Sequence, residues 1–117
     1  MILCVMDDLI FSIRIQTAAK SIGGIDVFFE RSPEMVLPRI REKQPSLVIF
    51  DLNSRKMDPM TALAAMKADP ALQGIRTLGF VSHVDTETIA TARAAGIDQV
   101  LARSAFAAQL GSILTSA

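Results

Sequence analysis

The chain has 117 residues, which is the length of one domain. Half of its residues are hydrophobic, enough to bury one continuous core, and twelve Lys and Arg residues balance twelve Asp and Glu residues. The formal net charge is therefore zero, and the absence of a basic stripe argues against nucleic acid as a direct partner. The sequence predicts a single domain over residues 1–117.

The first six residues form an apolar run that reaches Asp7 and Asp8 at once. This run is too short for the core of a signal peptide or for a membrane span, so no membrane association is expected. Cys4 is the single cysteine, which excludes an internal disulfide and indicates a reducing compartment. We expect Cys4 to be a small buried hydrophobic residue and the protein to be cytoplasmic.

Strand-length and helix-length patterns alternate along the first half of the chain. Residues 2–6 predict a strand, and apolar residues at helical spacing then predict a helix that Gly23-Gly24 ends. Residues 25–29 predict a second strand. Ser32-Pro33 has the residue types of a helix start, with Pro38 expected to kink or shorten the helix that runs towards Lys43.

The second half repeats the alternation. Residues 47–50 are the most hydrophobic predicted strand, as expected of a parallel strand buried on both faces. A helix over residues 59–68 and a strand over residues 77–81 follow. Asp85 is expected to cap a helix that ends at Gly96, before a strand over residues 100–102 and a last helix. The pattern predicts a doubly wound α/β fold, with five parallel strands and helices on both faces.

Polar side chains follow the predicted strands where ligands bind in such sheets, beyond the carboxyl ends. Asp7 and Asp8 follow the first strand, Asp51 the third, Ser82 the fourth and Arg103 the fifth. Any one of these residues alone would be an ordinary turn, capping or surface residue. Because they share one edge of the sheet, we expect three carboxylates, a hydroxyl and a cation to converge there.

Crowded carboxylates repel one another unless a cation joins them, and hard oxygen ligands suit Mg²⁺. Asp51 could then attack a phosphoryl donor as a nucleophile, while the metal and Arg103 stabilise the developing charge. Ser82 could donate a hydrogen bond to a phosphoryl oxygen.

These residues resemble those of a receiver domain of the response-regulator family, over nearly the whole chain. The resemblance rests on residues 5–8 (Val-Met-Asp-Asp), 47–53 (Leu-Val-Ile-Phe-Asp-Leu-Asn), 57–58 (Met-Asp), 82 (Ser) and 95–98 (Ala-Gly-Ile-Asp). It implies a flavodoxin-like sheet with strand order 2-1-3-4-5. It also implies Asp51 as the phosphoacceptor, and Asp7, Asp8, Asp51 and the backbone carbonyl of Asn53 as Mg²⁺ ligands.

Several positions depart from the family pattern. Arg103-Ser104 stands where the family has Lys-Pro, and a planar guanidinium differs in geometry from a compact ammonium. Val100 replaces the aromatic residue of the fifth strand, and Arg55 and Pro59 also differ from the family's acceptor loop. His83 stands where the family has a small residue, and we expect it to be an exposed loop residue.

The resemblance therefore implies an atypical receiver of two-component signalling rather than an enzyme. Its expected partner is a histidine kinase or another signalling protein, with a homodimer as a further possibility. Two versions remain open. In one, Asp51 is phosphorylated and the last two helices move; in the other, a pseudo-receiver docks partners through a fixed surface without phosphorylation.

Two other classes fit the sequence less well. An aspartate-nucleophile phosphatase of the haloacid-dehalogenase type needs a second Asp two residues after the first, where this chain has Asn53. A dinucleotide- or flavin-binding protein needs a phosphate-binding loop after the first strand, where this chain is acidic and lacks the Gly-x-Gly-x-x-Gly pattern.

Two further expectations concern the charges of the site. Arg103 is expected to pair with one of the three carboxylates and so to compete with Mg²⁺ and with the phosphoryl group. If the carboxylates repel one another, Asp8→Asn is expected to stabilise the metal-free fold by ~1 kcal/mol.

Overall fold

Five parallel strands form one sheet in the computed structural model, which describes residues 1–82 and 85–117. The strands are β1 (Ile2–Val5), β2 (Val27–Glu30), β3 (Leu47–Asp51), β4 (Arg76–Val81) and β5 (Gln99–Ala102). Their order is β2-β1-β3-β4-β5, and every neighbouring pair is parallel. The predicted sheet and its strand order are confirmed.

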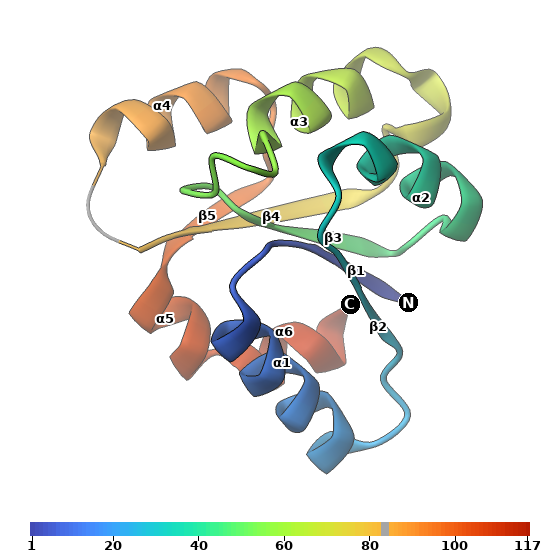
Figure 1. Cartoon of the computed structure of the whole chain (residues 1–117), viewed down its shortest axis with the longest axis vertical. Helices are drawn as coiled ribbons and strands as arrows, with labels where there is room; N and C mark the ends of the chain where they lie inside the picture. Colours follow the sequence, from blue (N-terminus) through green and yellow to red (C-terminus); the bar gives the residue numbers. More distant parts are fainter. Residues whose placement is uncertain (83–84) are drawn as a thin grey trace.

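Helices cover both faces of this sheet. They are α1 (Leu9–Ile22), α2 (Val36–Lys43), α3 (Pro59–Ala68), α4 (Thr86–Ala94), α5 (Arg103–Ala108) and α6 (Leu110–Ser116), with short 3-10 helices η1 (Pro33–Met35) and η2 (Pro70–Leu72). Figure 1 shows α2, α3 and α4 on one face and α1, α5 and α6 on the other. The fold is the predicted doubly wound α/β architecture.

Burial follows the position of each strand in the sheet. All five residues of β3, at the centre, are buried, as expected of a parallel strand with helices on both sides. On the face that carries α1 and α5, the rings of Phe11, Phe80 and Phe106 pack together with centroids 5.0 to 5.7 Å apart. This cluster holds α1 and α5 against β4, so the loops that begin these two helices are fixed beside each other.

Two helix predictions differ from the structure in detail. The segment after Ser32 begins as the 3-10 helix η1, and Ser32 makes no side-chain capping hydrogen bond. Pro38 lies in the first turn of α2, where a backbone N–H has no partner within the helix, so the proline costs no hydrogen bond and causes no break. The predicted last helix is two helices, since α5 ends before Gln109 and α6 begins after it.

Cys4 is fully buried, and burial raises the pKa of its thiol. Its expected role as a small buried hydrophobic residue is confirmed. No helix in residues 1–82 and 85–117 combines the length and the apolar character needed to cross a membrane. The expectation for His83 lies outside the described residues.

Candidate functional site

The structure brings the predicted site residues to one edge of the sheet. Asp7 and Asp8 follow β1, and Asp51 is the last residue of β3. Ser82 follows β4, and Arg103 follows β5 as the first residue of α5. Because all five strands are parallel, their carboxyl ends meet at this edge, as the sequence predicted.

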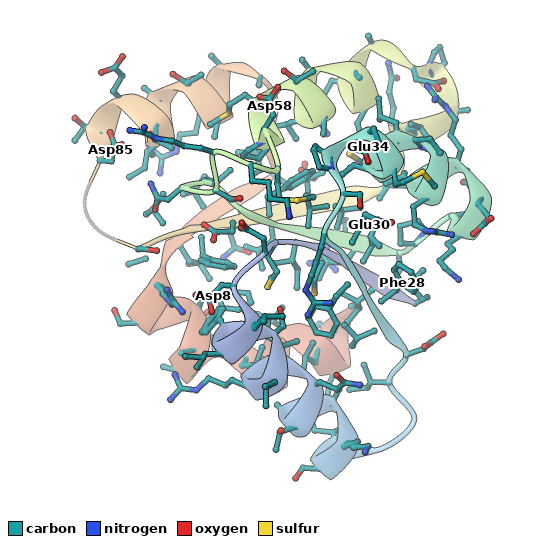
Figure 2. The ribbon with its side chains drawn as sticks, in the orientation of Figure 1. Asp8, Phe28, Glu30, Glu34, Asp58 and Asp85 are labelled. Atoms are coloured by element: carbon teal, nitrogen blue, oxygen red, sulfur yellow. The ribbon has the colours of Figure 1, made fainter. Side chains whose placement is uncertain are left out.

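Asp8 lies at the N-terminus of α1 and has two partners there (Figure 2). Its Oδ1 accepts a hydrogen bond from the backbone N–H of Phe11 at 2.9 Å, which caps the helix. Its Oδ2 accepts from Nη2 of Arg103 at 2.8 Å. The Phe11 N–H and the Arg103 guanidinium together hold the pKa of Asp8 below its ordinary value, despite the opposing effect of desolvation.

Arg103 is held from two directions. Its guanidinium pairs with Asp8 on one side, and its central carbon lies 4.2 Å from the centroid of the Phe11 ring on the other. The Arg103 side chain is 34% exposed. The predicted pairing of Arg103 with one of the carboxylates is confirmed.

Asp51 is the most buried of the three carboxylates, with 8% of its surface exposed. Its Oδ1 accepts a hydrogen bond from the backbone N–H of Asn53 at 3.0 Å. Burial raises the pKa of Asp51, and the negative charges of Asp7 and Asp8 raise it further. The Asn53 N–H and the positive charge of Arg103 act in the opposite direction. Arg103 therefore interacts electrostatically with Asp51 while it is bonded to Asp8.

The loops after β3 and β4 are tied together by Asn53. The Oδ1 of its side chain accepts a hydrogen bond from the backbone N–H of Ser82 at 2.6 Å, and the Leu52 N–H donates to the Phe80 carbonyl beside it. The sequence assigned Asn53 only a backbone carbonyl as a metal ligand in the site and did not predict this side-chain role. The hydrogen bond fixes the backbone of Ser82 next to the Asp51 loop.

Ser54 is a second residue that sequence reasoning missed. Its hydroxyl donates to Oδ1 of Asp7 at 2.8 Å and accepts from the backbone N–H of Met57 at 3.3 Å. Its own backbone N–H donates to the carbonyl of Asp51 at 3.2 Å. The only sequence signal is a short hydroxyl residue in the loop after an acidic strand end, which is typical of turns in general.

The carboxylates differ from the expected metal cluster in one respect. Among the residues that the structure describes, no three His, Cys, Asp or Glu side chains gather closely enough to hold a metal ion. The oxygens of Asp7 and Asp8 are instead bonded to Ser54 and Arg103. The donor types suit Mg²⁺, but the expected convergence of three carboxylates on one position is not the arrangement found. The roles of Asp7, Asp8, Asp51 and Asn53 as metal ligands stay a prediction.

Comparison with solved structures identifies many proteins of the same architecture, although no protein-family model matches the sequence and no curated protein matches it. The Mn²⁺-bound response regulator Rcp1 is 20% identical, with a TM-score of 0.79 over 96% of this chain and 89% of its own. The phosphorylated cyanobacterial phytochrome response regulator RcpA is 24% identical, with a TM-score of 0.78 over 98% and 89%. A two-component response regulator from Legionella pneumophila is 19% identical, with a TM-score of 0.82 over 99% and 98%. The chain therefore has the fold of response-regulator receiver domains.

Proposed function

We propose that this chain is a receiver domain of a two-component signalling system, with Asp51 as its phosphoacceptor and Arg103 as a restraint on that reaction. The observation that carries the proposal is the ion pair between Arg103 and Asp8, 2.8 Å long, beside the buried carboxylate of Asp51. The partner proposed is a histidine kinase or another signalling protein, and a homodimer is compatible with the same role.

In the proposed reaction, one oxygen of Asp51 attacks the phosphorus of a phosphohistidine or an acyl phosphate. The bond from phosphorus to the donor nitrogen or oxygen breaks, its electron pair leaves with the donor, and an aspartyl phosphate forms. Burial prepares Asp51 for this role because it removes competing water, while the positive charge of Arg103 favours the ionised nucleophile. The proposed role of Ser82, whose backbone N–H is bonded to Oδ1 of Asn53, is to donate its hydroxyl to a phosphoryl oxygen.

The proposed metal ligands are Asp7, Asp8, Asp51 and the Asn53 carbonyl. Mg²⁺ bound there would supply positive charge to the phosphoryl oxygens. Two proteins of the same fold support this part of the proposal, since one is described with Mn²⁺ bound and another as phosphorylated. Arg103 already neutralises Asp8, so it competes for the oxygen that a metal would use. We therefore expect weak metal affinity and slow phosphorylation.

Intact-mass spectrometry tests this proposal after incubation with acetyl phosphate and Mg²⁺. The wild type should gain a phosphoryl group slowly, and Arg103→Lys should gain it faster, because an ammonium makes one contact where a guanidinium spans several. Asp51→Asn should gain none. Phosphorylation of Asp51→Asn would contradict the assigned acceptor, and equal, rapid phosphorylation of the wild type and Arg103→Lys would contradict the restraint by Arg103.

A second candidate is a pseudo-receiver that docks partners without phosphorylation. The observation that favours it is again the Asp8–Arg103 pair, because the site is neutralised by the protein's own cation. In that case Asp51→Asn would leave partner binding unchanged, whereas a phosphorylated switch would lose its response to the donor.

The aspartate-nucleophile phosphatase is disfavoured by Asn53. An amide cannot act as the general acid that this chemistry needs, and its Oδ1 is engaged by the Ser82 N–H. The structure thus adds a physical reason to the sequence argument, and we propose a signalling role rather than an enzymatic one.

A further inference from the structure

An open groove of about 550 Å³ runs along the β5 edge of the sheet. Residues from five elements or their flanking loops line it: α1, the end of β4, α4, β5 and α5. β5 is the edge strand of the sheet, and Figure 1 shows α4 and α5 on opposite faces beside it. The volume lies in the range of small-molecule sites in proteins, about 300–1,000 Å³.

The floor and walls of this groove are mostly apolar. The aliphatic side chains that contribute to them include Val81, Ile89, Val100, Leu101 and Ala107. Val81 is buried, whereas the other four are half-buried, so apolar surface remains open to a ligand. Val100 helps to keep this apolar surface open, because an aromatic ring at its position would fill part of the space that the smaller valine leaves.

The charged residues that line the groove are all arginines. Arg14 comes from α1, Arg93 from α4 and Arg103 from the start of α5, and no Asp or Glu is among the described lining residues. Arg103 is paired with Asp8, but within residues 1–82 and 85–117 neither Arg14 nor Arg93 forms an ion pair. An apolar groove lined by two guanidinium groups that have no ion-pair partner among the described residues is complementary to a molecule with an apolar body and an anionic head.

We propose that this groove binds a small amphipathic anion, a carboxylate with an apolar tail, with the tail against Val100 and Leu101 and the carboxylate on the guanidinium group of Arg14 or Arg93. A guanidinium offers paired donors that match the two oxygens of a carboxylate. The groove adjoins the proposed phosphoacceptor site, since Ser82 and Arg103 also line it, but its ligand is proposed to contact neither Asp51 nor a metal. Its binding is measured without any phosphoryl donor, so its failure would leave the proposed function untouched.

The test is an amide NMR titration of the ¹⁵N-labelled wild-type chain with octanoate, and with 1-octanol as the neutral counterpart. Octanoate should shift the amides of Val100, Leu101 and Ala107, and it should bind more tightly than 1-octanol. The double variant Arg14→Gln/Arg93→Gln should bind octanoate about tenfold more weakly, since each lost charge-assisted contact costs affinity. Both arginines are exposed, so their replacement leaves the core unchanged.

Two further variants make the test specific. Arg41→Gln, which removes an exposed arginine of α2 that pairs only with Asp69 in the described chain, should bind octanoate like the wild type. Val100→Phe should block octanoate binding by filling the groove. Equal affinity of the double variant and the wild type, equal binding of 1-octanol, or shifts confined to other surfaces would overturn the proposal. Concentration-dependent shifts of the same amides without ligand would assign the groove to a second copy and would also overturn it.

Discussion

Two ion pairs at the same edge of the sheet have similar components: a carboxylate, an arginine and a phenylalanine ring against the guanidinium. At the end of β2, Oε1 of Glu30 accepts from Nε of Arg39 at 3.1 Å, and the guanidinium of Arg39 lies 4.9 Å from the Phe28 ring. At the end of β1, Oδ2 of Asp8 accepts from Arg103 at 2.8 Å, and that guanidinium lies 4.2 Å from a phenylalanine ring. Figure 2 shows Asp8 at the start of α1 and Glu30 at the end of β2, with Phe28 two residues earlier in that strand.

The two pairs differ in the sequence separation of their partners and in the groups that lie near them. Glu30 and Arg39 are nine residues apart, and Glu30 also accepts the backbone N–H groups of Arg31 and Ser32, so the pair fixes a local turn. Asp8 and Arg103 are 95 residues apart, and both interact electrostatically with Asp51. The same chemistry is structural at one strand end and, by our account, regulatory at the other, because only the second pair has a buried carboxylate beside it.

The substitution with the largest expected effect on stability is the replacement of Glu30. Glu30 is 7% exposed and accepts three hydrogen bonds, so Glu30→Ala would leave two backbone N–H groups and the Nε–H of Arg39 without their acceptor, while Arg39 keeps its pair with Glu42. We expect a loss of about 3 kcal/mol in the free energy of unfolding. Urea denaturation measures this. A loss below about 1 kcal/mol would mean that water replaces the carboxylate and that the pair is not structural.

The next effect is a gain of stability at Asp51. Because the pKa of Asp51 is raised in the folded state, its ionised form is disfavoured by folding at neutral pH. Asp51→Asn keeps an acceptor for the Asn53 N–H, removes the charge, and should stabilise the metal-free fold by about 1 kcal/mol.

The pH dependence of that gain gives a second check. A raised pKa contributes stability below the unfolded-state value, near 3.8, and this contribution is lost as the pH rises through the folded-state pKa. The difference in unfolding free energy between Asp51→Asn and the wild type should therefore vanish in acid and grow towards neutral pH. A difference that does not change with pH would exclude a charge effect.

The smallest effect is expected at Asp8, and its sign is opposite to the one expected from sequence. The sequence suggested that Asp8→Asn would relieve repulsion, but the structure gives Asp8 an N–H donor and a guanidinium, which lower its pKa. Asparagine still caps a helix, so the substitution isolates the ion pair. Since both side chains are about one-third exposed, we expect a loss of about 0.5–1 kcal/mol, measured by denaturant unfolding without Mg²⁺ and reduced in high salt. A gain in stability would instead mean that repulsion between Asp8 and the neighbouring carboxylates outweighs its ion pair with Arg103.

Much of this fold was predictable because local patterns and global topology agree. The apolar run of β3, the boundaries of α3 and the Asp85 cap of α4 follow from hydrophobic periodicity and capping chemistry, and the structure has all three. The division of the last helix at Gln109 was not predictable, because an apolar stripe over Phe106, Leu110 and Leu114 fits one helix or two.

The site was predictable in its residues but not in its contacts. Strand ends and parallel topology place Asp8, Asp51 and Arg103 at one edge, and the permanent charge of Arg103 predicts a carboxylate partner. The sequence does not indicate which carboxylate pairs with Arg103, because the contacts of its guanidinium with Asp8 and with the Phe11 ring are tertiary. The same holds for the bonds of Asn53 and Ser54, because a loop side chain gives no periodic signal.

The central claim is that the guanidinium of Arg103 binds the carboxylate of Asp8 and so competes with a metal ion for that carboxylate. An amide NMR titration with Mg²⁺ tests this claim most directly. The wild type, Arg103→Gln and the matched control Arg39→Gln are compared. We expect Mg²⁺ to shift the amides around Asp7, Asp8 and Asp51, with about tenfold tighter binding to Arg103→Gln and unchanged affinity in the control. Equal or weaker binding to Arg103→Gln, or shifts that leave all three aspartates unmoved, would contradict the account.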